Sequence, residues 1–151
     1  MAMRRLILRA NALYVGIAAA VSLAFMDFPG IYFGTGPEGR VLNGAWGAGV
    51  GFVEAHGLAL IISVLLWRAV PARSWHVTGA SVGALLGTCN LVFWQVFIDT
   101  DALAMGYITT SLHWTFAFAQ FFAAIGAGDH QGIGRPFAHQ RGELDASGKS
   151  S

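Results

Sequence analysis

Residues 45–70 read AWGAGVGFVEAHGLALIISVLLWRAV, and this stretch decides the class of fold. Glu54 and Arg68 are its only charged residues, and the second lies near its end. A helix needs about 20 mostly apolar residues to cross about 30 Å of hydrocarbon. The stretch is long enough and apolar enough to form a membrane-spanning helix.

Three further stretches have the same character, and they cover residues 6–28, 77–98 and 105–127. The connections at 71–75 and 99–104 are short, which makes the helices that they join antiparallel neighbours. The first connection, 29–44, is longer and rich in glycine, so we expect a loop there. The pattern predicts an all-α fold, a four-transmembrane-helix antiparallel bundle over residues 1–128.

The composition of the whole chain agrees with this class. Of its 151 residues, 55% are hydrophobic and 11% are charged, whereas soluble domains have about 25% charged residues. This excludes a water-soluble globule. The formal net charge of +1 gives no basic face for nucleic acid, and the single cysteine, Cys89, excludes an intramolecular disulfide.

The basic residues predict the orientation, because Lys and Arg near the ends of spans stay in the cytoplasm. Arg40 alone among the nine basic residues falls on the outer side. Both termini are therefore expected in the cytoplasm. Residues 129–151 are rich in Gly, Ser and charged residues, and we expect them to form a disordered cytoplasmic tail. The basic residues on the predicted inner side are Arg4, Arg5, Arg9, Arg68, Arg73, Arg135, Arg141 and Lys149.

A cleaved signal peptide is the alternative interpretation of the first span. Arg4 and Arg5 precede an apolar run that reaches Ser22-Leu23-Ala24, a small-x-small pattern. The run continues past Ala24, which favours an uncleaved span.

Glycines repeat along two of the spans at intervals of four. Small residues let helices approach closely in lipid, so these positions predict helix packing. A face shared between chains, in a homo-oligomer or a larger membrane complex, is the alternative use. The glycines are Gly47, Gly51, Gly79, Gly83 and Gly87.

Polar residues continue these stripes at three- or four-residue spacing and predict a site inside the bundle. An ionisable side chain at membrane depth costs about 2.5 to 3.5 kcal/mol on insertion scales, and it marks a functional site by default. Glu54, Asn90 and His113 fall at similar depth on three spans, so we expect them to converge. The predicted ligand-binding residues are Glu54, Asn90, Trp94, Thr109, His113 and Gln120.

His56 lies about 200° around the helix from Glu54 and is expected to face another helix together with Phe52, Ala59 and Ser63. Paired with His113, it supplies the two axial ligands of a b-type haem, an alternative function. Two others remain: interhelical hydrogen bonds without a ligand, and acid–base catalysis on a lipid by Glu54 and His113. No metal site is expected, because too few further ligands are identifiable.

The sequence EAHGLALI at residues 54–61, followed by LLWR at 65–68, resembles the second helix of the DoxX-like membrane proteins. The resemblance implies a small four-helix, multi-pass protein of the bacterial inner membrane, with relatives linked to quinone-dependent oxidation or oxidative stress. Glu54 is the residue that maps onto the motif. We therefore expect an amphipathic apolar ligand, a quinone or another membrane lipid, and a role as a redox accessory.

Overall fold

The computed structural model describes residues 2–126, and within this range all regular secondary structure is helical, without strands. The all-α class predicted from the sequence is confirmed. The tail predicted for residues 129–151 lies outside the described residues. The elements are α1 (Ala2–Ser22), the π-helical η1 (Leu23–Asp27), α2 (Phe28–Phe33), α3 (Gly39–Leu42), α4 (Trp46–Arg68), α5 (Arg73–Val92), α6 (Trp94–Asp99) and α7 (Leu103–Ile125).

The first apolar span continues further than the sequence predicts. Helix α1 passes through η1 into α2 without a loop, so the segment runs from Ala2 to Phe33. Pro29 does not break it, because it stands in the first turn of α2, where a proline is tolerated. Gly34 ends the segment in the left-handed conformation, with φ of 61°. The predicted loop from residue 29 therefore starts five residues late and contains the short helix α3.

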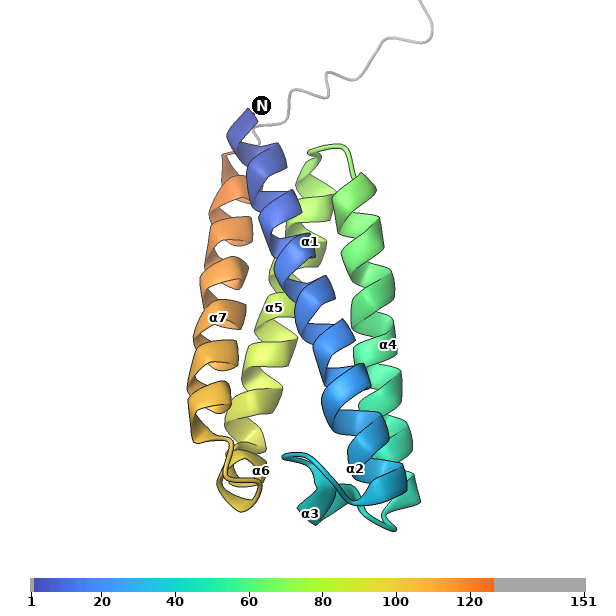
Figure 1. The fold of residues 1–151 in the computed structure, drawn as a ribbon. Coiled ribbons are helices and arrows are strands. Elements are labelled where there is room, and N and C mark those ends of the chain that lie inside the picture. The colour runs from blue at the N-terminus through green and yellow to red at the C-terminus, as the bar shows by residue number, and fades with distance from the viewer. Residues whose placement is uncertain (1, 127–151) are drawn as a thin grey trace, which may run out of the picture.

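The other boundaries follow local rules. Helix α4 ends at Arg68, and Ala69 and Ala72 on either side of Pro71 are extended. The third span is divided at Phe93 into α5 and α6, which the apolar pattern does not reveal. The short connections make α4 and α5 antiparallel, and likewise α5 and α7 (Figure 1).

The long helices pack as two close pairs, α1 with α4 and α5 with α7, and α1 also contacts α5 and α7. The helices α4 and α5 are antiparallel, but the prediction that their short connection makes them packed neighbours is wrong, because each packs mainly on a helix of its own pair. In the first pair, the Ser63 hydroxyl donates a hydrogen bond to the Ala12 carbonyl at 2.9 Å. Leu8, Ala12 and Leu66 form a small buried core there.

The predicted stripe of Gly79, Gly83 and Gly87 lies against α7 of the same chain. A Cβ on Gly83 would lie 2.9 Å from the carbonyl oxygen of His113 and 3.2 Å from the Cβ of Ala117. The stripe therefore packs α5 on α7, and α7 covers the face that a second chain would need.

Gly83→Leu is expected to destabilise the bundle by more than the roughly 1–3 kcal/mol typical of overpacking. The reason is that the atoms nearest to the new side chain include backbone atoms of α7, which cannot move aside as a flexible side chain can. Gly51→Leu is the matched control, since nothing lies within 4 Å of a Cβ there. Both changes remove a helical glycine, so helix propensity favours both equally. Thermal unfolding of the purified variants in detergent measures the difference, and equal melting temperatures would contradict the packing argument.

The packing role predicted for Gly47 and Gly51 is wrong within the chain. Both are exposed, and a Cβ on either would meet nothing within 4 Å. Gly49 is the buried glycine in this turn of α4, and it packs against Ile31. A four-residue repeat indicates that two positions share a face, but it does not tell which face turns inward.

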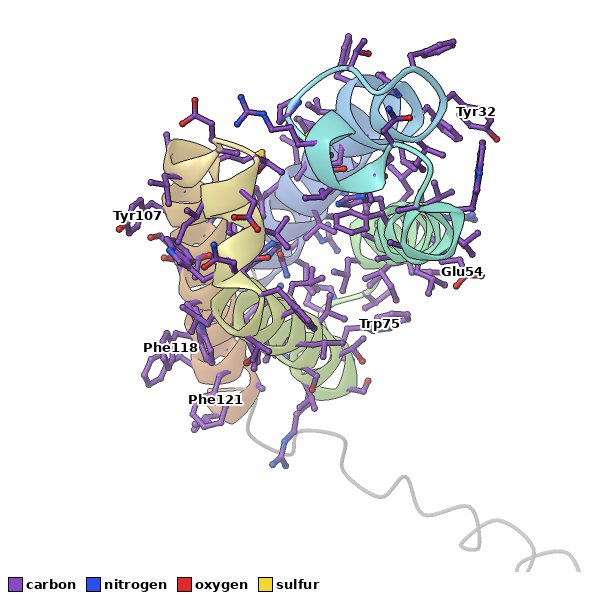
Figure 2. All side chains as sticks on the ribbon, turned by 90° about the horizontal axis from the view of Figure 1, so that it is seen from below. Tyr32, Glu54, Trp75, Tyr107, Phe118 and Phe121 are labelled. Atoms are coloured by element: carbon purple, nitrogen blue, oxygen red, sulfur yellow. The ribbon has the colours of Figure 1, made fainter. Side chains whose placement is uncertain are left out.

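Polar side chains lie inside the described part of the molecule, while large apolar side chains cover its outside. Tyr107, Phe118 and Phe121 point outward from α7 (Figure 2) and are 63%, 55% and 52% exposed. Eight described residues are buried polar ones: Asn11, Asp27, Glu38, His76, Thr100, Thr110, His113 and Gln120.

Two helical segments of the described chain are long and apolar enough to cross a membrane, Ala2–Phe33 and Trp46–Arg68. Only 28% and 11% of their apolar stretches are buried. A core helix of a soluble protein would be mostly covered by its neighbours, so this exposure favours a lipid environment.

Candidate functional site

A cavity of about 240 Å³ is lined by residues of both helix pairs and by residues in or next to η1, α3 and α6. Figure 1 shows α2, α3 and α6 together at one end of the bundle. Apolar side chains such as Val15, Phe52, Leu86 and Phe97 form much of its wall. The hydrogen-bonding side chains that line it are Ser22, Glu38, His56, Asn90, Thr100, Thr109 and His113.

Asp27 and His56 form a hydrogen-bonded pair beside the cavity. The Oδ2 atom of Asp27 lies 2.7 Å from Nδ1 of His56, and Asp27 is 0% exposed. Asp27 is the last residue of η1, and π-helical turns of this kind are frequent at functional sites. As a carboxylate, Asp27 accepts the Nδ1–H of His56, which leaves Nε2 as the ring nitrogen available to a ligand.

Glu38 adds a second carboxyl group to this pair. The carboxyl group of Glu38 interacts with that of Asp27, and a hydrogen bond between two carboxyl groups requires a proton on one of them. Glu38 is 6% exposed. Burial, a hydrogen bond to Asp27 and the negative charge of Asp27 together raise the pKa of Glu38 to about 8, and burial is the largest of the three causes. At neutral pH Glu38 therefore holds the shared proton.

The glycine-rich connection brings Glu38 to this place. Gly34 reverses the chain after α2 in a conformation that favours glycine. Gly39 then packs so closely on Gly34 that a Cβ would collide with its carbonyl oxygen. A larger residue at position 39 would push Glu38 away from Asp27.

A second polar group lies on the α5 and α7 side of the cavity. The amide Nδ2 of Asn90 donates to the Thr109 hydroxyl at 3.1 Å, and this hydroxyl donates to the Met105 carbonyl at 2.8 Å. The ring of His113 lies edge-on to Tyr14, with 5.3 Å between the ring centroids. Among the described residues, the buried Nδ1 atom of His113 has no hydrogen-bond partner.

The structure brings together three of the residues predicted from the sequence. Asn90, Thr109 and His113 line the cavity. His56 lines it as well, on the helix face predicted to meet a neighbour through Ala59 and Ser63.

The predicted convergence of Glu54 with Asn90 and His113 is wrong. Glu54 is exposed and points away from the bundle on the outer side of α4 (Figure 2). The helix is rotated so that the face carrying His56, Ser63 and the fully buried Leu66 turns inward. Acid–base catalysis by Glu54 and His113 is excluded by the same geometry.

Trp94 and Gln120 do not line the cavity either. Trp94 packs edge-on against Phe97 and Tyr107. Gln120 is fully buried elsewhere along α7, where its Oε1 atom accepts a hydrogen bond of 2.6 Å from Nδ1 of His76. Arg4 donates to the other ring nitrogen of His76 at 3.3 Å, so this network ties α1, α5 and α7 together.

Asp27 and Glu38 line or adjoin the cavity but were not among the residues predicted from the sequence. A carboxylate between Met26 and Phe28, inside an apolar run, was the available indication for Asp27. For Glu38 the sequence contains no comparable indication, because it stands in a predicted loop, where an acidic residue is usual. Only the chain reversal at Gly34 brings it to Asp27.

Comparisons of the chain with protein-family models, with curated proteins and with solved structures found no significant match.

Proposed function

We propose that the chain is a four-span protein of the bacterial inner membrane that binds an amphipathic apolar ligand, a quinone or another lipid, in this cavity. The observation that carries the proposal is the cavity itself, apolar along much of its wall and lined by His56 and Glu38 on one side and His113 and Asn90 on another. Such a lining suits a ligand with a polar head and an apolar body.

The membrane location is supported by the distribution of charge along the bundle. Arg4, Arg5, Arg9, Arg68 and Arg73 lie at the end where α1 begins and α4 joins α5 (Figure 1). The described acidic residues other than Glu54 occur in or next to η1, α3 and α6, which form the opposite end. With the arginine end in the cytoplasm, the cavity lies in the outer half of the membrane.

The chemistry of the lining favours a ligand with hydrogen-bonding carbonyl or hydroxyl groups. Nδ1 of His113 is buried without a partner among the described residues, and leaving such a group unsatisfied costs about 1–3 kcal/mol. A quinone carbonyl accepts a hydrogen bond and a quinol hydroxyl donates one, so either satisfies an imidazole. The carboxyl groups of Asp27 and Glu38 lie next to His56, and together they offer a bound quinol groups with which to exchange protons.

The test is retention of the ligand by the purified protein. Lipids and quinones extracted from wild-type protein in mild detergent are quantified by mass spectrometry and compared with those from His113→Ala and Glu54→Gln. We expect a roughly five- to tenfold loss for His113→Ala, the value of one hydrogen bond. Glu54→Gln, on the outside of α4, is expected to retain as much as wild type.

Identical retention by wild type and His113→Ala would refute the cavity as the binding site. Equal loss in Glu54→Gln would point to general damage to the bundle or to a ligand held on its outside.

A b-type haem is the second candidate, because His56 and His113 line the same cavity. Bis-histidine ligation would have to use Nε2 of His56, since Nδ1 is bound to Asp27. An absorption spectrum of the purified protein decides between the candidates: a Soret band lost in His113→Ala would replace the quinone proposal.

A further inference from the structure

A cluster of arginines lies at the opposite end of the bundle from the cavity. Arg5 and Arg9 line two adjoining surface hollows, and Arg68 and Trp67 line one of them together with Ala69 and Val70. We call Arg5, Arg9 and Arg68 the arginine cluster.

The cluster is built by two helices. Arg5 and Arg9 are four residues apart and therefore share one face of α1. The guanidinium of Arg9 lies 5.4 Å from the ring centroid of Trp67, which holds it against α4. Arg68 is the last residue of α4.

No carboxylate lies among the described residues that line the two hollows. The three positive charges therefore repel one another with no acidic side chain of the lining to compensate them. Guanidinium groups bind phosphate through paired N–H donors, which makes a phosphate the anion that suits the cluster.

Apolar side chains surround the cluster. Leu6 and Val70 are 61% and 73% exposed, and Trp67 is 48% exposed. These side chains offer contact to acyl chains, which a free phosphate ion does not have. Tryptophan is also enriched at the level of the lipid head groups.

We propose that the arginine cluster binds the phosphate head group of an anionic phospholipid, whose acyl chains lie along α1 and α4. Basic pockets between helices on the cytoplasmic side bind such head groups in membrane proteins. The site shares with the proposed function only the membrane location, and it is separate from the cavity and its ligand.

The experiment measures lipid binding to the purified full-length protein in detergent by native mass spectrometry, with phosphatidylglycerol and with the net-neutral phosphatidylcholine. Wild type is expected to prefer phosphatidylglycerol. Since each basic residue near the surface contributes about 1 kcal/mol, Arg5→Gln should weaken this preference about fivefold, and the double variant Arg5→Gln, Arg9→Gln about 30-fold.

Arg40→Gln is the matched control, because it removes one arginine near the opposite end of the molecule and should leave the preference unchanged. His113→Ala should also leave it unchanged, which separates this site from the cavity. If the variant that carries Arg9→Gln does not fold, Arg9→Lys replaces it, because lysine keeps the positive charge. Arg9→Lys is expected to weaken the binding of phosphatidylglycerol less than Arg5→Gln does.

Three results would overturn the proposal. These are equal binding of both lipids by wild type, an unchanged preference in Arg5→Gln, and a loss in Arg40→Gln as large as that in Arg5→Gln. Displacement of phosphatidylglycerol by inorganic phosphate at an equal concentration would assign the cluster to a free anion instead.

Discussion

His56→Ala is expected to lower the free energy of unfolding by about 1–3 kcal/mol, the cost of leaving a buried polar group without its hydrogen-bond partner. The reason is the position of Asp27, which is 0% exposed and bonded to His56 at 2.7 Å. Without the imidazole, the Oδ2 atom of Asp27 loses its hydrogen-bond partner, while the carboxyl group of Glu38 stays beside it. The variant must then hold an uncompensated charge or take up a second proton.

Unfolding of the purified variants in detergent, followed by tryptophan fluorescence, measures this effect. The control is Glu54→Ala, an exposed position on the same helix, where a change within about 0.5 kcal/mol is expected. Asp27→Asn should recover part of the loss when combined with His56→Ala, because the amide removes the buried charge. If His56→Ala is as stable as Glu54→Ala, the pair does not stabilise the fold.

Glu38→Gln is expected to remove a large part of the pH dependence of stability. The pKa of Glu38 rises from an ordinary value of 4.5 to about 8, mainly through burial. Between these values the folded chain holds a proton that the unfolded chain has released. The contribution of Glu38 is therefore fully present below pH 4.5 and is lost as the pH rises toward 8.

The size of this loss is on the order of 5 kcal/mol, for a rise from 4.5 to about 8 at about 1.36 kcal/mol for each pKa unit. Glutamine stays neutral and can still donate a hydrogen bond to Asp27, so its stability does not fall in this window. The difference in melting temperature between Glu38→Gln and wild type should thus increase in favour of the variant from pH 5 to pH 9. Glu54→Gln controls for removal of a carboxyl group, and parallel profiles for Glu38→Gln and wild type would contradict a proton held at Glu38.

The substitutions His56→Ala and Glu38→Gln both change a residue that interacts with Asp27. Glu38 interacts with Asp27, Asp27 is hydrogen-bonded to His56, and Glu38 and His56 line the cavity wall. A ligand that gains or loses protons there would do so through groups whose charges already depend on one another. Retention of the ligand by Glu38→Gln should then depend on pH differently from retention by wild type. This difference is expected even if both proteins retain the same amount of ligand at neutral pH.

The helical class and the approximate limits of the long helices could be read from the sequence, because apolar length and turn residues act locally. The short connections at Pro71 and Asp101 likewise set adjacent helices antiparallel. The glycine stripe of α5 was also identified correctly as a packing face, since small residues at four-residue spacing allow close approach whatever the partner.

The site depended on the tertiary structure in two ways. Glu54 and His56 lie on opposite sides of α4, and both sides carry glycines and apolar residues, so the sequence does not tell which side faces the bundle. The packing of α4 against α1 through Ser63 turns His56 inward. Asp27 and Glu38 meet because η1 ends at the fully buried Asp27 and the chain reverses at Gly34. The sequence by itself thus determined a set of apolar helices and their antiparallel order, which follow from local composition. The tertiary structure alone decided which charged groups share the interior, because that depends on helix rotation and on a chain reversal that periodicity does not encode.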